Sequence, residues 1–264
     1  MGHRQAFGLE QRALSEDLAA EHRDAAQLAR QAGLALMELR EAPAGVRDVG
    51  AAGDRLAHNL LVSELNRLYP DDAVRSEEGL EHVASHGRLW IVDPLDGTRE
   101  FRQAGRSDWA VHVALSVGGE PVVGAVALPA VDIVLSTGAP PELTPPTGEP
   151  PRVVVSRSRP PDVAYDVAEA VGGAMVPLGS AGAKIAAVIL GAAEIYVHAG
   201  GQYDWDSCAP VAVALACGLH ASRLNGDPLR YGDPDAWLPD LVVCRPEYAT
   251  AVLDVTTRQR RPYW

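Results

Sequence analysis

The stretch LWIVDPLDGT, residues 89–98, joins a short apolar run to a polar motif. The apolar run predicts a strand in the interior of a sheet, and Asp93 and Asp96 follow where that strand leads into a loop. Pro94 fixes the backbone angle φ there, and Gly97 allows another group to approach the backbone closely. Because a strand holds the loop at its end rigid, catalytic and binding groups often collect at such positions. The stretch therefore predicts a sheet strand with a functional site at its end.

The two aspartates of this motif are suited to holding a metal ion. Two carboxylates three residues apart on a tight turn can converge on one point, and such hard oxygen ligands suit Mg²⁺ or Mn²⁺. Gly97 and Thr98 would then offer backbone N–H groups to an anion, as at the start of a helix. Taken alone, an Asp-x-x-Asp pair is better explained as an Asx-type turn with two solvated carboxylates.

Further carboxylates stand at the ends of other predicted elements. Glu77 and Glu78 follow a predicted short strand at 73–75, and Asp206 precedes an apolar helical stretch. Each has a simpler explanation by itself, a solvated loop for the glutamates and a helix N-cap for the aspartate. Together with the aspartates of the central motif, they supply the ligands of a two-metal phosphoryl-transfer site. The Asp-x-x-Asp spacing fits metal ligation better than the Asp-x-Asp nucleophile of haloacid-dehalogenase-type phosphatases.

The composition is that of a globular chain and limits its partners. The 264 residues carry a formal net charge of −12, and 47% of them are hydrophobic. We find no run approaching the ~20 apolar residues of a membrane helix and no signal-peptide pattern at the N-terminus. Cys208, Cys217 and Cys244 form neither a disulfide framework nor a Cys-x-x-Cys metal site. We therefore expect a cytoplasmic protein with neither a nucleic acid polymer nor a membrane as partner, although the acidic balance leaves room for a small anionic ligand held by metal ions.

Hydrophobic spacing predicts the order of helices and strands. Helices are expected at 15–40, 54–69, 162–171, 181–190 and 207–217. Strands are expected at 89–92, 109–117, 121–128, 131–135, 153–155, 174–177, 194–197 and 241–244. Gly118 and Gly119 predict a hairpin turn, and six prolines lie within 138–151. We predict an N-terminal α+β domain with the metal-binding motifs over 1–138, a Pro-rich linker or loop over 139–151, and a C-terminal α/β domain over 152–264.

The acidic motifs resemble those of the inositol monophosphatase superfamily in order and spacing, over about residues 15 to 245. The matching segments are DPLDGT at 93–98, SEE at 76–78 and WDxxAP at 205–210. Within the superfamily, GTREF at 97–101 resembles the CysQ branch of 3′(2′),5′-bisphosphate nucleotidases. SAGAK at 180–184 and HAGGQ at 198–202 look particularly like actinobacterial members of that branch. The resemblance implies an α+β fold, the layered α-β-α-β-α sandwich of the sugar phosphatases.

The resemblance also implies a set of metal ligands. Glu77, Asp93 and the backbone carbonyl of Leu95 would hold one Mg²⁺. Asp93, Asp96 and Asp206 would hold a second, so that Asp93 bridges the two. Two or three ions are implied in total, and Mn²⁺ could substitute. Glu78 is implied to support these ligands without binding the metal itself.

The catalytic pair implied by the resemblance is Asp54 with Thr98, whose hydrogen bond would orient or deprotonate the attacking water. The implied substrate contacts are Glu77, Asp96, Gly97, Thr98, Lys184 and Asp206. Lys184 is the only lysine of the chain and would bind the 5′-phosphate of a nucleotide. Ser180 precedes it by four residues instead of the family's three, so its role stays open. Tyr231 could flank an adenine, although surface packing explains it better.

The reaction implied by these matches is Mg²⁺-dependent hydrolysis of the 3′-phosphate of 3′-phosphoadenosine 5′-phosphate by metal-activated water, giving AMP. The phosphosulfate form is a further implied substrate, and the family is commonly homodimeric. Two alternatives stay open. One is an inositol-1-phosphate or fructose-1,6-bisphosphate phosphatase of the same superfamily, because the motifs barely discriminate between phosphate esters. The other is a noncatalytic metal-dependent nucleotide sensor, which the intact Asp54–Thr98 pair disfavours.

Overall fold

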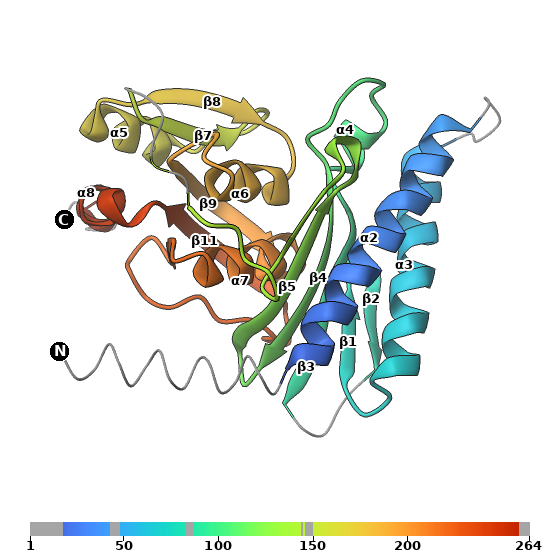
Figure 1. Cartoon of the computed structure of the whole chain (residues 1–264). Coiled ribbons are helices and arrows are strands. Elements are labelled where there is room, and N and C mark those ends of the chain that lie inside the picture. The colour runs from blue at the N-terminus through green and yellow to red at the C-terminus, as the bar shows by residue number, and fades with distance from the viewer. Residues whose placement is uncertain (1–17, 43–47, 83–86, 144, 146–149, 259–264) are drawn as a thin grey trace.

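The computed structural model describes residues 18–42, 48–82, 87–143, 145 and 150–258. Two sheets alternate with three layers of helices, as Figure 1 shows. Helices α2 (Ala19–Glu41) and α3 (Val49–Leu68) cover the outer face of the first sheet. Helices α6 (Ala181–Ile189) and α7 (Cys208–Ala216) lie between the sheets, and α5 (Asp162–Val171) and α8 (Ala249–Arg258) lie beyond the second. The predicted α+β sandwich with α-β-α-β-α layers is therefore confirmed.

The first sheet has the strand order β2-β1-β3-β4-β5-β6. Its strands are β1 (Ala73–Ser76), β2 (Gly79–His82), β3 (Arg88–Asp96), β4 (Ala110–Val117), β5 (Glu120–Leu128) and β6 (Ile133–Ser136). Only the β1–β3 pair is parallel. The predicted hairpin joins β4 to β5, and Gly118 and Gly119 both have positive φ, as a tight hairpin turn requires. The short helix α4 (Thr98–Phe101) follows β3 directly.

The second sheet has the order β10-β11-β9-β7-β8. Its strands are β7 (Arg152–Ser156), β8 (Ala174–Leu178), β9 (Ile195–Tyr203), β10 (His220–Ser222) and β11 (Trp237–Cys244). Strands β7, β8 and β9 run parallel, so their carboxyl ends lie at one edge of the sheet. The 3₁₀ turn η2 (Asp204–Asp206) begins at that edge, and the remaining short turns are η1 (Pro129–Val131) and η3 (Pro246–Tyr248).

One apolar core joins the two halves of the chain across the helices between the sheets. It contains Ile91 and Val126 of the first sheet together with Ile185 of α6 and Leu241 of the second sheet. Helix α7 lies close to β5 because Gly124 has no side chain, and a Cβ there would overlap the Ala209 carbonyl oxygen. The two sheets therefore have a fixed relative position, although the predicted domain division at 139–151 stays a prediction.

Several predicted boundaries differ from the structure. Helix α3 begins at Val49 instead of residue 54, because Asp48 is its N-cap and accepts a hydrogen bond from the Ala51 N–H at 3.1 Å. Asp54 therefore lies within the helix. The predicted cap Ser15 lies outside the described residues. Strands β2 and β10 and helix α8 were not predicted, because the first two are too short to show a clear hydrophobic period. No helix within the described ranges is long and apolar enough to cross a membrane.

Candidate active site

The central acidic cluster combines Asp93, Asp96 and Asp206. One carboxylate oxygen from each lies within 4.8 Å of the others. The sequence predicted that the two aspartates lie on a tight turn. In the structure both remain in strand β3. Asp93 pairs with His112 of β4 and Asp96 with Ala110, so β3 carries one extra residue in a bulge. In a regular strand, side chains three residues apart point to opposite faces, and the bulge corrects this alternation so that both carboxylates converge.

Burial and mutual repulsion dominate the electrostatics of this cluster. Asp93 is 2% exposed, and burial raises its pKa well above the ordinary range, with further increases from Asp96, Glu77 and Asp206. Burial and then Asp96 raise the pKa of Asp206 to about 7. No ion pair within the described ranges includes Asp93 or Asp206. These hard oxygen donors lie together without an ion-pair partner from the protein, and such a set fits a divalent metal ion. A bound ion would favour the charged forms of the carboxylates.

Glu77 extends the cluster at the end of β1. The residue is exposed, but its carboxylate is partly desolvated, and this desolvation raises its pKa to about 7 together with the charges of Asp54, Asp206 and Glu78. Glu77 therefore lies near enough to the other carboxylates to share their electrostatic field. The structure places all four sequence-predicted metal-binding carboxylates around one region.

The Asp54 and Thr98 side chains approach each other from α3 and α4. The Thr98 hydroxyl lies 3.5 Å from Asp54 Oδ1 and 3.2 Å from the carbonyl oxygen of Leu95. Burial, followed by the charge of Glu78, raises the pKa of Asp54 to about 6. Gly97, between β3 and α4, has a φ of 90°, and a Cβ there would lie only 3.0 Å from Ser180 Cβ. The glycine thus allows the turn to lie directly against the second half of the protein.

Asp96 also contacts the start of helix α6, a connection that the sequence did not reveal. Its carboxylate accepts hydrogen bonds from the backbone N–H groups of Ala181 at 3.2 Å and Gly182 at 2.6 Å. His112 Nε2 lies 3.3 Å from Asp96 Oδ2, while His112 Nδ1 lies 3.0 Å from the carbonyl oxygen of Trp205. A Cβ at Gly182 would overlap the His112 ring. These contacts fix Asp96 between the two halves, and no local spacing in the sequence indicates them.

Lys184 is buried behind the start of α6, with 4% of its surface exposed. Its Nζ donates hydrogen bonds to the carbonyl oxygens of Gly179 and Ser180, the latter at 2.7 Å. Burial lowers its pKa, and the charges of Asp96 and Asp206 oppose that shift. Ser180, whose role the sequence left open, is the N-cap of α6 and accepts from the Ala183 N–H at 2.8 Å. Contact between Lys184 and a substrate phosphate stays an untested prediction, while the hydrogen bonds of Nζ to two carbonyl oxygens favour a supporting role.

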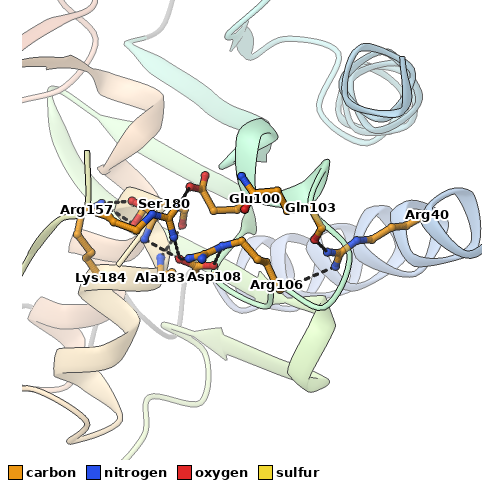
Figure 2. A network of polar contacts seen from close by, with 10 residues as sticks. Arg40, Glu100, Gln103, Arg106, Asp108, Arg157, Ser180, Ala183 and Lys184 are labelled. Carbon is orange, nitrogen blue, oxygen red and sulfur yellow. Dashed lines mark hydrogen bonds and ion pairs between the residues drawn. The ribbon is translucent and has the colours of Figure 1, made fainter. Parts of the chain in front are cut away.

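Figure 2 shows a polar network that supports the segment before α6. Arg157, just after β7, pairs with Glu100 of α4 and lies 3.5 Å from Asp108. Asp108 also pairs with Arg106 and accepts a hydrogen bond from the Gly179 N–H at 2.7 Å. Glu100 belongs to the GTREF segment that resembles the CysQ branch, but no role was predicted for it from the sequence. The network connects both halves beside the acidic cluster.

Surface packing was predicted for Tyr231, but the residue is buried. Its hydroxyl lies 3.3 Å from Ser207 Oγ, next to the acidic cluster's Asp206. The tyrosine reaches the core because the chain between β10 and β11 folds back over the first sheet, where the Tyr231 N–H donates to the Gly119 carbonyl oxygen. It therefore supports the segment around Ser207 instead of presenting a ring to a ligand.

Comparisons with known proteins agree with this arrangement. A family model described as "Inositol monophosphatase family" matches residues 18–260. A Mycobacterium leprae protein named 3′-phosphoadenosine 5′-phosphate phosphatase is 46% identical over 262 residues, covering 88% of this chain and 91% of the relative. The Escherichia coli 3′(2′),5′-bisphosphate nucleotidase CysQ is 31% identical over 232 residues, covering 80% and 94%. The crystal structure of 2′AMP-bound SaIMPase-II superposes with a TM-score of 0.74 at 20% identity, covering 91% and 96%, and shares the fold.

Proposed function

Because the chain belongs to the inositol monophosphatase family, we propose that it hydrolyses the 3′-phosphate of 3′-phosphoadenosine 5′-phosphate, giving AMP and inorganic phosphate. The family is one of metal-dependent phosphatases, and a phosphate ester is therefore the class of substrate. The observation that carries the nucleotide assignment is the 46% identity, over 88% of the chain, to a relative named for this activity. The convergence of Asp93, Asp96 and Asp206 supports a metal-dependent mechanism.

Mg²⁺ is the proposed metal, and its ligands are oxygen atoms alone. Glu77, Asp93, Asp96 and Asp206 would supply carboxylates, and Leu95 a backbone carbonyl. A bound divalent ion neutralises charge on the phosphoryl group and makes a water molecule more acidic. The carboxylates would hold the ion, and without it their own charges would repel a phosphate ester.

The chain's own groups account for proton transfer and phosphate orientation. Asp54 has a pKa of about 6, so it is largely ionised at neutral pH yet basic enough to accept a proton. Thr98 Oγ1 would relay that proton to Asp54 Oδ1, since it already lies 3.5 Å away. The backbone N–H groups of Gly97 and Thr98, at the start of α4, would donate to a phosphoryl oxygen.

Phosphate release from three substrates tests the proposal. We expect a higher kcat/KM for 3′-phosphoadenosine 5′-phosphate than for inositol 1-phosphate or fructose 1,6-bisphosphate, all measured with Mg²⁺. Excess EDTA should abolish release, and added Mg²⁺ or Mn²⁺ should restore it. Equal kcat/KM values would instead indicate a broad sugar phosphatase. Release from none of the three, with calorimetric proof of metal and nucleotide binding, would indicate the nucleotide sensor.

Finer parts of the proposal have separate measurements. The phosphosulfate form can be assayed beside the other substrates, and the number of ions can be counted by titrating Mg²⁺ calorimetrically. A homodimer is tested by sedimentation equilibrium. The cytoplasmic setting is supported by three free cysteines, Cys208, Cys217 and Cys244, and is tested by cell fractionation.

A further inference from the structure

Three aromatic side chains form a cluster at the edge of the second sheet that the proposed chemistry does not use. Tyr203 ends β9 and Trp237 begins β11, and the two residues pair directly across these antiparallel strands. Their ring centroids lie 5.6 Å apart at an angle of 81°. Trp205 stacks on Tyr203, with centroids 4.6 Å apart and planes 14° from parallel. Tyr203 is 44% exposed and Trp237 45% exposed, so nearly half of each ring residue faces solvent.

The exposed rings are held in place by the surrounding backbone. Gly201 has a φ of 87°, and a Cβ there would overlap the six-membered ring of Trp237. The indole therefore lies directly against the bare backbone of β9, in a space that any other residue would fill. Tyr203 is supported from its inner side by Trp205, which packs against the core between the sheets. The cluster is thus a fixed aromatic surface, which we call the aromatic platform and define as Tyr203 and Trp237.

The aromatic platform is rigidly connected to the acidic cluster. The backbone N–H of Tyr203 donates to Asp206 Oδ2 at 2.8 Å, across the single 3₁₀ turn η2. Three residues of a 3₁₀ turn advance by about 6 Å. Arg75 fixes the same turn, since its Nη1 lies 2.6 Å from Asp204 Oδ2 and 2.8 Å from the Asp233 carbonyl oxygen. Arg75 is two residues from Glu77, so the platform and the cluster share one support.

The chemistry of this surface matches a planar aromatic ring. Aromatic side chains stack on nucleobases in a manner that is tolerant of base identity, and each such contact contributes measurably to binding. A nucleoside phosphate whose phosphoryl group lies at the acidic cluster carries its base several ångströms away, beyond the ribose. Inositol and sugar phosphates have no planar ring to place there.

We propose that Tyr203 and Trp237 stack on the purine base of the substrate and thereby make the site prefer a nucleotide over inositol and sugar phosphates. The inference rests on the proposed function, since it names the part of the protein that would recognise the nucleoside. It assigns specificity to the second half of the chain, whereas the motif at the end of β3 handles the phosphoryl group that all these esters share.

The test is the ratio of kcat/KM for 3′-phosphoadenosine 5′-phosphate to that for inositol 1-phosphate in the Trp237→Leu and Tyr203→Leu variants. Each ratio should fall about 10-fold, the effect expected for loss of one base-stacking contact, mainly through a higher KM for the nucleotide. Tyr203→Phe should retain the wild-type ratio because it keeps the ring. Tyr165→Leu, an exposed tyrosine on α5, is the matched control.

A binding readout independent of turnover accompanies the kinetics. With Mg²⁺ present, AMP should quench the intrinsic tryptophan fluorescence of the wild type, and ribose 5-phosphate should not. Trp237→Leu should remove most of that change. If the leucine variants lost activity equally on the nucleotide and on inositol 1-phosphate, the inference would be overturned. The two rings would then have a structural role. The inference would also be overturned if the variants kept the wild-type kcat/KM ratio but sedimented differently. The platform would then be a contact between copies of the chain.

Failure of the inference is distinct from failure of the proposed function. The substrate preference of the wild type tests the proposed function. The change in the nucleotide-to-inositol kcat/KM ratio between wild type and variant tests the platform. A wild type that prefers the nucleotide, with variants that keep that preference, would overturn the platform alone. A wild type that lacks the preference would remove the proposed function, and AMP quenching that is equal to that by ribose 5-phosphate would then overturn the platform as well.

Discussion

Buried carboxylates meet two different surroundings in this protein. Outside the candidate site, each has a guanidinium close by: Asp204 lies 2.6 Å from Arg75, Asp240 lies 2.9 Å from Arg223, and Glu194 lies 2.7 Å from Arg152. Inside it, the buried Asp93 and the half-buried Asp206 have no such partner within the described part of the chain. The protein contains many arginines, so their scarcity at the cluster is a property of the site and not of the composition.

The pKa values reflect this difference. Burial alone would raise the pKa of Glu194, but hydrogen bonds from Arg152 lower it below the ordinary value. Asp206 is half-buried, and because no guanidinium compensates for its desolvation, its pKa rises to about 7. A buried charge needs a partner, and a partner that is missing from the protein can be an ion from solution. Paired carboxylates therefore maintain the fold, whereas unpaired ones are available to a metal.

The largest expected effect comes from replacing a carboxylate by an amide, once in the unpaired group and once in the paired group. Asp93→Asn should lower kcat/KM by at least ~10³-fold, because a metal contributes several kcal/mol of transition-state stabilisation. Asp240→Asn should keep most of the activity but lower Tm by about 5 °C, since it leaves Arg223 unpaired and partly buried. Phosphate release and thermal denaturation measure both variants. A comparable loss of activity in the two would break the distinction between them.

Asp54 is a third kind of carboxylate, one whose neighbour is a hydroxyl. Asp54→Asn should lower kcat by ~10²-fold or more with little change in KM, the usual contribution of a positioned proton acceptor. Metal affinity, measured by calorimetry, should stay close to that of the wild type. Thr98→Ser keeps the hydroxyl and is the matched control. A large loss of metal affinity in Asp54→Asn would instead group this residue with the metal ligands.

Lys184 is a buried cation whose charge interacts with that of Asp206, and its ammonium donates to two backbone carbonyl groups. Lys184→Met should lower kcat/KM by ~10-fold for both the nucleotide and inositol 1-phosphate, as expected when support for a site is lost. The steady-state kinetics of the two substrates are compared side by side. A rise in KM confined to the nucleotide would show instead that Lys184 contacts the 5′-phosphate, as the sequence resemblance implies.

The smallest effect is a pH dependence of stability in the metal-free protein. The folded state raises the pKa of Asp206 to about 7, so between about pH 4 and pH 7 it binds more protons than the unfolded state. Its contribution to the free energy of unfolding therefore falls as pH rises through that window. Asp206→Asn should remove this contribution, so its Tm in EDTA should exceed that of the wild type by a few degrees at pH 7 and by less at pH 5.

The control for this pH dependence is the paired carboxylate. Asp240→Asn should change Tm in EDTA by a similar amount at both pH values. Added Mg²⁺ should raise the wild-type Tm more at pH 7 than at pH 5, because protons compete with the metal for the same oxygens. The difference in Tm between the wild type and Asp206→Asn is the quantity to compare. If the wild type gained on the variant between pH 5 and pH 7, the interpretation would be contradicted.

Local patterns were sufficient for much of the fold. The apolar run before Asp93 predicted a central strand, and two glycines predicted the hairpin of β4 and β5. The order of the acidic motifs predicted that carboxylates from three segments would meet. These features depend on residue types within a few positions of each other. Where local signals were weak, as at the start of α3 or in the short strand β10, the boundaries were wrong or missing.

Contacts between distant segments were beyond the reach of the sequence. Asp96 meets the start of α6, which lies 86 positions later in the chain at Gly182, and no period or motif connects the two. Tyr203 and Trp237 become neighbours only through the register of β9 and β11. The burial of Lys184 and of Tyr231 likewise depends on how the helices pack between the sheets.

The chemical groups of this protein and their local conformations follow from neighbouring residues in the chain. The end of β3 combines carboxylates, a glycine and a hydroxyl because these residues are adjacent in the chain. The packing of distant segments sets which carboxylates lack a cation, that the single lysine is buried and which rings stay exposed. Those outcomes depend on the stacking of two sheets through one shared core, where burial and distance set the cost of each charge.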